Sequence, residues 1–213
     1  AYFQAIVDTQ TKKVHKYEAL IRYVTKEGVE IAPYNFINVA KKTKLYPNII
    51  KIVIQDSFKL IKNKNKRVSV NISFDDIANE ETTAFIYDIL EQNKEYTQFL
   101  EFEILESEGI ENYDEVVNFI TQIKALGAKI AIDDFGTGYS NFEHILKLNV
   151  DFIKIDGTLI KNVVHNEKHK IIVETIVDFA KKIKAKTIAE FVSDEAIYLT
   201  IKEIGVDFSQ GYY

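Results

Sequence analysis

Residues 129–156 read KIAIDDFGTGYSNFEHILKLNVDFIKID and combine two short apolar runs with a helical pattern. The runs Lys129–Ile132 and Phe152–Ile155 have the length and composition of buried strands. Between them, Asn141–Leu148 has apolar residues at the three- and four-residue spacing of a helix. A strand, a helix and a second strand in succession form the repeating unit of a parallel sheet. The stretch therefore predicts an α/β protein.

The same alternation continues on both sides of this stretch. Further strands are predicted at Val68–Ile72, Leu100–Ile104, Lys186–Ala189 and Val206–Phe208. Further helices are predicted at Glu81–Gln92, Asn112–Leu126, Glu167–Lys184 and Ser193–Ile204. Gly127 and Gly205 follow two of these helices, at the position where glycine commonly ends a helix. The repeated strand–helix units indicate a parallel sheet covered by helices.

The opening of the chain adds two strands and two helices. Strands are predicted at Tyr2–Asp8 and Val14–Tyr23, joined by the polar turn Thr9–Lys13, and helices follow at Pro33–Lys42 and Tyr46–Asn63. About eight strands result, enough to close a (β/α)₈ barrel, and the 213 residues lie near the lower limit of about 200 for that fold. With 8 Gly, 2 Pro and no linker-like segment, the sequence predicts a single domain over residues 1–213.

Composition excludes several classes of site and partner. The chain has no Cys, which excludes disulfides, thiolate metal sites and cysteine nucleophiles. Its net charge of −5 argues against a DNA or RNA polymer as partner, although a phosphate substrate stays open because bound cations can reverse the local field. No apolar run reaches the ~18 residues of a membrane span, and the N-terminus does not resemble a signal peptide. The absence of Met, even at position 1, is expected either for a fragment of a longer chain or for a chain whose modified Met residues are not written.

Polar residues follow the apolar run of almost every predicted strand. They are Asn71, Glu103, Asp133, Asp134, Lys154, Asp156, Glu190 and Gln210, and the second strand carries Glu18 and Arg22. In a barrel of this kind the C-terminal strand ends form one face, where catalysis takes place. Several carboxylates on one rim repel one another unless a cation compensates them. Oxygen ligands without Cys or clustered His favour Mg²⁺ or Mn²⁺, with Ca²⁺ as a competitor.

Asp133 and Asp134 are adjacent at one of these strand ends. If the backbone turns both toward one site, one carboxylate can bridge two metals roughly 3.5–4 Å apart, a spacing that clamps a phosphoryl group for in-line displacement. The following loop, Phe135–Ser140, has two glycines and resembles a phosphate-cradling loop, although a plain turn fits the glycines equally well. Lys154 among these carboxylates is expected to be charged and able to orient a water or stabilise an oxyanion.

The polar residues belong to short motifs that span the chain. These are Glu18-Ala19-Leu20 extended by Arg22, the strand end at Asn71, Glu103-Ile104-Leu105-Glu106-Ser107, the run from Asp133 to Ser140, Lys154-Ile155-Asp156-Gly157, Ala189-Glu190-Phe191-Val192 and Gln210-Gly211-Tyr212. In this order they resemble the EAL domain family, the bacterial phosphodiesterases that hydrolyse cyclic di-GMP. The resemblance implies a modified (β/α)₈, TIM-like barrel and metal-dependent hydrolysis of cyclic di-GMP to linear 5′-pGpG.

The resemblance also implies roles for individual residues around two Mg²⁺ or Mn²⁺ ions. Ligands of one metal are expected to be Glu18, Asn71, Glu103 and Asp133, and Asp133 is expected to bridge to a second metal that Asp134 also binds. Lys154 and Glu190 are expected to position and activate the attacking water, and Glu18 to be essential for catalysis. Whether Glu190 acts as a base or as a ligand of the second metal stays open. Substrate contacts are expected from Gln4, Leu20, Arg22, Asp156 and Gln210, and Glu106 is expected to brace the loop after Asp134.

Partners follow from the same resemblance. Family members often carry sensory or diguanylate cyclase domains, so the chain is expected to be one cytoplasmic domain of a longer signalling protein. A homodimer is expected through the region after the Asp133–Ser140 loop. The alternative is a non-catalytic receptor that binds cyclic di-GMP without cleaving it. Because the chain keeps the metal-ligand and loop residues that such receptors usually lose, the sequence favours the enzyme.

Overall fold

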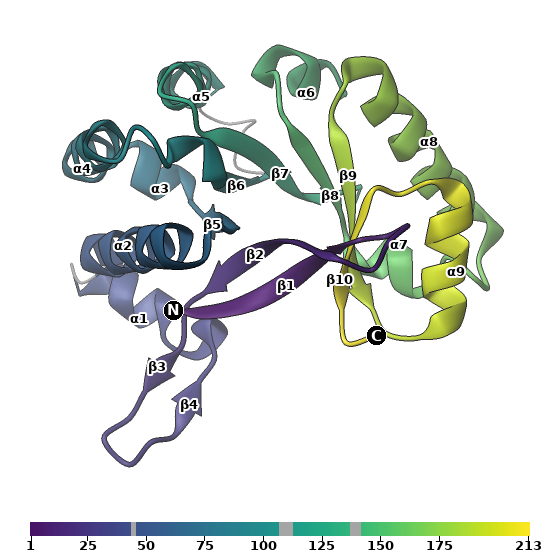
Figure 1. Ribbon diagram of the computed structural model, residues 1–213, viewed down its shortest axis with the longest axis horizontal. Coiled ribbons are helices and arrows are strands. Elements are labelled where there is room, and N and C mark those ends of the chain that lie inside the picture. The colour runs from purple at the N-terminus through teal and green to yellow at the C-terminus, as the bar shows by residue number, and fades with distance from the viewer. Residues whose placement is uncertain (44–45, 107–112, 137–141) are drawn as a thin grey trace.

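Eight strands of the described residues close into a barrel, in the order β1, β10, β9, β8, β7, β6, β5 and β2 (Figure 1). The structure is a computed structural model that describes residues 1–43, 46–106, 113–136 and 142–213. The barrel strands are β1 (Tyr2–Asp8), β2 (Val14–Leu20), β5 (Arg67–Asn71), β6 (Leu100–Leu105), β7 (Lys129–Phe135), β8 (Phe152–Ile155), β9 (Lys186–Val192) and β10 (Phe208–Gly211). Strand β1 is antiparallel to both of its neighbours, and the other neighbouring pairs are parallel. The predicted fold class, a modified (β/α)₈ barrel, is confirmed.

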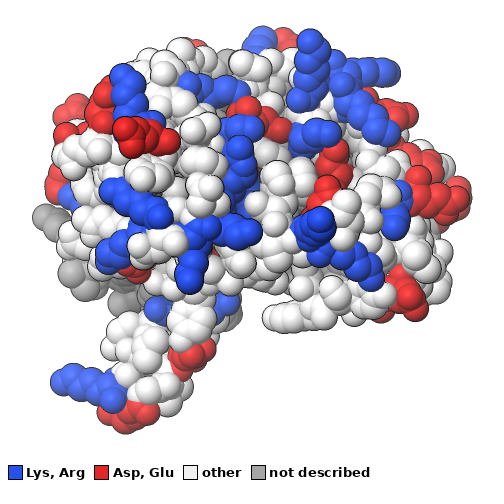
Figure 2. Space-filling model, viewed as in Figure 1, with Lys and Arg blue, Asp and Glu red and all other residues white. Residues whose placement is uncertain are grey.

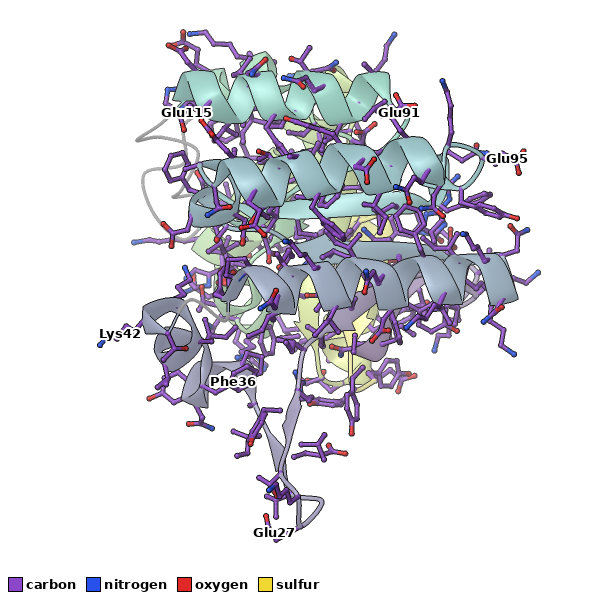
Figure 3. All side chains as sticks on the ribbon, turned by 90° about the vertical axis from the view of Figure 1, so that its left-hand side faces the viewer. Glu27, Phe36, Lys42, Glu91, Glu95 and Glu115 are labelled. Carbon is purple, nitrogen blue, oxygen red and sulfur yellow. The ribbon has the colours of Figure 1, made fainter. Side chains whose placement is uncertain are left out.

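Helices cover the outside of the barrel. The longer ones are α2 (Tyr46–Lys64), α4 (Glu80–Gln92), α5 (Tyr113–Ala125), α8 (Glu167–Ile183) and α9 (Glu195–Ile204), and the shorter ones are α1 (Ile37–Lys42), α3 (Phe74–Ile77), α6 (Phe142–Leu148) and α7 (Gly157–Lys161). Figure 3 shows α2, α4 and α5 side by side along one flank, and Figure 1 places α8 and α9 on the opposite flank. Over the face drawn in Figure 2, Lys and Arg side chains are interspersed with Asp and Glu side chains.

Helix α8 illustrates how local sequence sets these elements. Its buried residues Val173, Ile176, Val177 and Ala180 recur at three- and four-residue spacing and form one apolar face. The side chain of Asn166 caps the N-terminus, because its oxygen accepts from the N–H groups of residues 168 and 169. The helix therefore begins after the cap and packs its apolar face against the barrel.

The barrel interior has an apolar floor beneath a polar layer. Ile6, Ala131, Phe152, Ile188 and Phe208 form a buried cluster separate from the larger core between strands and helices. Because side chains alternate along a strand, the inward positions nearer the C-terminal strand ends are the ones that carry polar groups. This layering confines the polar side chains to the mouth of the barrel.

A two-stranded hairpin projects from the barrel and corrects one boundary. The second strand, predicted to run to Tyr23, ends at Leu20, which pairs with Tyr2 at the start of β1. Beyond that pair β1 offers one terminal residue, so the chain leaves the sheet. It then forms the hairpin of β3 (Tyr23–Val24) and β4 (Glu30–Ile31), whose tip is marked by Glu27 in Figure 3.

Other boundaries also differ from the predictions. The helix predicted at Pro33–Lys42 divides at Phe36 into a 3₁₀ turn, Pro33–Asn35, and α1, because Phe36 leaves helical geometry with φ −133°. The last strand lies at Phe208–Gly211 rather than Val206–Phe208. The starts of the helices predicted from Asn112 and Asn141 lie outside the described residues. Among the residues that are described, no helix combines the length and apolar character needed to cross a membrane.

Candidate active site

The C-terminal ends of the parallel strands bring the predicted site residues to one mouth of the barrel. Glu18 lies on β2, Asn71 ends β5, Glu103 lies on β6, Asp133 on β7, Lys154 on β8, Glu190 on β9 and Gln210 on β10. Backbone register places Asn71 opposite Glu103 and Gln4 opposite Glu18. Residues from seven strands therefore meet although they are far apart in the sequence.

Lys154 is at the centre of this site. Its Nζ atom lies 2.7 Å from Glu103 Oε2, 2.8 Å from Glu190 Oε1 and 3.0 Å from Asp133 Oδ1. Glu18 Oε2 is 3.6 Å away, and the Lys154 side chain is 1% exposed. Burial alone lowers the pKa of Lys154, but the surrounding carboxylates raise it well above its usual value, so the group is an ammonium. Four carboxylates around one ammonium leave an excess of buried negative charge.

Two amide side chains hold Glu18 in place. Asn71 Nδ2 donates to Glu18 Oε1 at 2.8 Å, and Gln210 Nε2 donates to Glu18 Oε2 at 2.7 Å. Gln210 Nε2 also lies 3.2 Å from Gln4 Oε1, whereas Gln210 Oε1 is buried and accepts no hydrogen bond from the described residues. Both oxygens of Glu18 are thus oriented by donors, and Gln210 keeps one acceptor for a group that is not part of this chain.

Buried charge perturbs the acidity of the cluster. Burial raises the pKa of Glu190 to about 8, with a further increase from Asp133 that outweighs Lys154. Burial, Asp133 and Asp156 raise the pKa of Asp134 to about 6. Burial also acts to raise the pKa of Glu103, but the ammonium groups of Lys154 and Lys16 hold it below its usual value. The carboxylates of Glu190 and Asp134 therefore lack sufficient positive charge around them.

Asp133 and Asp134 both reach the site through an irregularity in β7. Strand register against β8 shifts between Ile132 and Phe135, and Asp134 has a left-handed φ of 55°. Consecutive side chains of a regular strand point to opposite faces, so this bulge is what turns the second carboxylate inward. Oxygen atoms of Asp133, Asp134 and Glu190 lie within 4.8 Å of one another. The two aspartates thus combine with Glu190 in a second carboxylate group beside Lys154.

These donors fit divalent metal ions. Carboxylate and amide oxygens are the ligands that Mg²⁺ and Mn²⁺ prefer, and the excess negative charge gives the site a reason to bind cations. Glu18, Asn71, Glu103 and Asp133 are the residues that could hold one ion. Asp133, Asp134 and Glu190 are close enough to hold another.

Glu106 contacts the loop that follows the aspartates. The N–H of Gly136 donates to Glu106 Oε2 at 3.3 Å. Gly136 has φ 103°, and a Cβ there would lie 2.6 Å from Leu159 Cδ1, so a side chain would both strain and crowd this turn. Residues 137–140, the rest of the predicted loop contacts, lie outside the described residues.

A cavity of about 450 Å³ opens beside the carboxylates. Of the predicted substrate contacts, Gln4, Leu20 and Gln210 line it, together with Glu18, Glu190, Lys161, Phe191 and Tyr212. The described lining does not include Arg22 or Asp156. Arg22 Nη1 donates to Ile21 O at 2.8 Å, and the Asp156 side chain caps α7 by accepting from Thr158 N at 2.6 Å. Three of the five predicted contacts are therefore placed at the cavity, and two are engaged elsewhere.

A second buried ion pair beneath the site was missed by the sequence analysis. Lys16 on β2 is 0% exposed and pairs with Glu101 on β6, which is 4% exposed. Its Nζ also lies 3.9 Å from Glu103 Oε1 and 4.4 Å from the centre of the Phe152 ring. Lys16 precedes Glu18 by two residues, and Glu101 precedes Glu103 by two. Because residues two apart in a strand face the same side, this alternation was the signal that could have revealed the pair.

Comparisons with known proteins agree with this arrangement. A family model described as "EAL domain" matches residues 1–213. A curated relative, the cyclic di-GMP phosphodiesterase PdeB of Shewanella oneidensis, is 31% identical over 95% of this chain and 24% of its own length. The chain spans about a quarter to a third of the length of the first curated relatives it matches.

Solved structures share the fold over the whole chain. The PaMucR phosphodiesterase in complex with c-di-GMP has a TM-score of 0.89 at 27% identity, covering 98% of this chain and 87% of that one. An EAL domain protein from Listeria monocytogenes has a TM-score of 0.91 at 28% identity, covering 100% and 85%. With the family model matching from the first residue to the last, the chain belongs to the EAL domain family.

Proposed function

We propose that this chain hydrolyses cyclic di-GMP to linear 5′-pGpG and that it requires Mg²⁺ or Mn²⁺. The observation that carries the proposal is the buried set of carboxylates around Lys154, next to a cavity of about 450 Å³ at the barrel mouth. Membership of the EAL domain family and the names of relatives such as PdeB support cyclic di-GMP as the substrate. The oxygen-only donor set supports a hard divalent cation.

Hydrolysis to 5′-pGpG sets the protons that the residues must move. Water oxygen bonds to phosphorus and the bond from phosphorus to a ribose O3′ breaks, so the water loses a proton and O3′ gains one. Divalent ions held by these oxygen ligands would supply Lewis acidity at the phosphate and lower the pKa of a bound water. Glu190, with a pKa of about 8 in this structure, is suited to exchange a proton near neutral pH. Lys154 donates to Glu190 at 2.8 Å and fixes the position of that carboxylate.

Substrate binding is assigned to the cavity beside the carboxylates. Gln210 presents a buried Oε1 atom without a donor among the described residues, which suits an N–H or O–H group of a bound nucleotide. Gln4 and Leu20 lie on the same wall. For Arg22 and Asp156 to contact substrate as predicted, each must exchange the backbone contact it makes here.

The whole protein is proposed to be larger than this chain. Because the chain spans about a quarter to a third of its first curated relatives, sensory or diguanylate cyclase domains are proposed for the parent protein, with this domain in the cytoplasm. A homodimer is proposed through α6, which follows the Asp133–Ser140 loop and exposes Leu146. Leu146→Glu is expected to lower the dimer fraction in sedimentation velocity, and an unchanged distribution would exclude α6 as the contact.

The experiment that tests the function separates an enzyme from a receptor. Purified protein is incubated with cyclic di-GMP and Mg²⁺ or Mn²⁺, with excess EDTA as a control, and the nucleotides are separated by ion exchange. Glu18→Ala is expected to abolish 5′-pGpG formation because it removes a proposed metal ligand. Glu27→Ala, at the hairpin tip far from the mouth, is the matched control and is expected to keep full activity. If the wild type binds cyclic di-GMP but forms no product with either metal, the receptor is correct.

A further inference from the structure

Phe191 has an unusual backbone conformation beside a proposed catalytic residue. It follows Glu190 in β9 and has a left-handed φ of 53°. Most other described non-glycine residues with positive φ lie in connections between elements, namely Lys12, Asn65, Asn149 and Lys184. Asp134 and Phe191 are the two that lie within barrel strands. A bulky residue rarely adopts this geometry without a compensating role, and such strain is concentrated at functional sites.

The strained backbone lays the Phe191 ring along α7. A Cβ on Gly157 would come within 2.2 Å of Phe191 Cδ2, so the ring occupies space that any side chain at 157 would need. The Nζ atom of Lys161, one turn further along α7, lies 4.2 Å from the centre of the ring. The ring is thus held against one helix by a glycine and a lysine.

The remaining surface of the ring is open toward the site. Phe191 is 54% exposed although it lies next to a buried carboxylate. It lines the same cavity as Glu190, Leu20 and Gln210. A large exposed aromatic ring next to an active site is costly in water unless it has a ligand to cover it. Lys161 adds a positive charge to this wall, which favours an anionic ligand.

We propose that Phe191 is a specificity-determining residue whose ring stacks against one purine base of the dinucleotide. Base–aromatic stacking needs a flat, pre-oriented ring, and the contacts with Gly157 and Lys161 provide that orientation. The ammonium of Lys161 lies close enough to favour the phosphates joined to that base. This inference rests on the proposed function, because it deepens the assignment of the cavity to a cyclic dinucleotide. The alternative is that Phe191 packs on α7 for stability alone.

Substitution with glycine separates these two roles. Glycine adopts a φ of 53° without strain, so Phe191→Gly is expected to leave the thermal midpoint unchanged or raise it. Loss of one stacked base is expected to raise KM about tenfold, with kcat changed by less than about twofold. Phe191→Tyr keeps a flat ring and is expected to retain the wild-type KM. Tyr23→Ala, on the hairpin, removes a ring that is also 54% exposed and serves as the matched control with unchanged kinetics.

A fluorescent base tests stacking without relying on turnover. A cyclic dinucleotide carrying 2-aminopurine is mixed with protein by stopped flow, and its fluorescence is followed before hydrolysis. Stacking quenches this base, so the wild type and Phe191→Tyr are expected to quench it and Phe191→Gly is not. Equal quenching and equal KM in Phe191→Gly would overturn the proposal, as would absence of quenching by the wild type. Quenching that depends on Phe191 in a protein that forms no 5′-pGpG would keep the stacking role and reject the phosphodiesterase.

Discussion

Replacing Lys16 with methionine tests how much the buried ion pair beneath the site contributes. Methionine keeps the length of the side chain but removes the ammonium. Glu101, 4% exposed, would then retain a buried carboxylate without the lysine it pairs with. Breaking a buried pair on one side costs about 3–5 kcal/mol because the remaining charge is uncompensated. We expect the free energy of unfolding of Lys16→Met to fall by about that amount at pH 7.5.

Urea unfolding measures this loss with two internal comparisons. The double variant Lys16→Met/Glu101→Leu removes both charges and is expected to recover most of the stability, because an apolar pair replaces a desolvated one. Lys59→Met is the matched surface control, since Lys59 is 2.9 Å from Asp56 but its side chain is 73% exposed. An exposed pair of this kind contributes about 0–1 kcal/mol. The midpoint should shift with the slope unchanged if stability alone is affected.

The effect also has a predicted sign with pH. Burial already raises the pKa of Glu101, and loss of Lys16 removes the charge that lowers it. A carboxyl whose folded-state pKa lies above its unfolded value stabilises the fold when protonated, and that stability is lost as pH rises. The deficit of Lys16→Met is therefore expected to be smallest near pH 5 and to grow toward pH 8. A stability at pH 7.5 equal to that of Lys59→Met, or a double variant as unstable as the single one, would refute this reasoning.

Three further predictions concern the metal site. Without metal, the free energy of unfolding should fall as pH rises from about 4.5 to about 8, because the folded-state pKa of Glu190 exceeds its usual 4.5, and saturating Mg²⁺ should flatten this fall in thermal melts. Glu106→Gln should raise the Mg²⁺ concentration for half-maximal rate while the thermal midpoint stays unchanged; superimposable Mg²⁺ titrations would contradict a brace. Lys154→Met should abolish 5′-pGpG formation and lower unfolding stability by about 3–5 kcal/mol, measured by urea, because several buried carboxylates lose their ammonium.

The strand–helix alternation predicted the barrel because it is written in local sequence. Each apolar run between polar turns is long enough to be a buried strand, and the runs from Val68 onward lie within structure-defined strands or close to them. The hairpin of β3 and β4 was missed because its strands are two residues each, and their ends are set by where β1 runs out of partners. That limit is a long-range property of the sheet, so no window around Tyr23 contains it.

The candidate site was predictable to the extent that strand ends converge. Glu18, Glu103, Asp133 and Glu190 meet around Lys154 because parallel strands end at one mouth. The geometry of individual side chains was less accessible. Asp156 caps α7, a five-residue helix too short to give a periodic signal. Phe191 reads as one more apolar residue, and its left-handed backbone depends on the packing of α7 against β9.

The two buried lysines together explain why an acidic cluster can exist inside this barrel before any metal binds. Glu103 lies between them, 2.7 Å from Lys154 Nζ and 3.9 Å from Lys16 Nζ, and its pKa is lowered despite complete burial. Glu190, which has Lys154 alone, has its pKa raised to about 8. Because a ligand that is already ionised and fixed needs no proton release, Glu103 is preorganised for a cation, whereas Glu190 gains its charge when a cation arrives. The same site thus pairs a permanent ligand with a proton acceptor, and the difference between them comes from the second lysine.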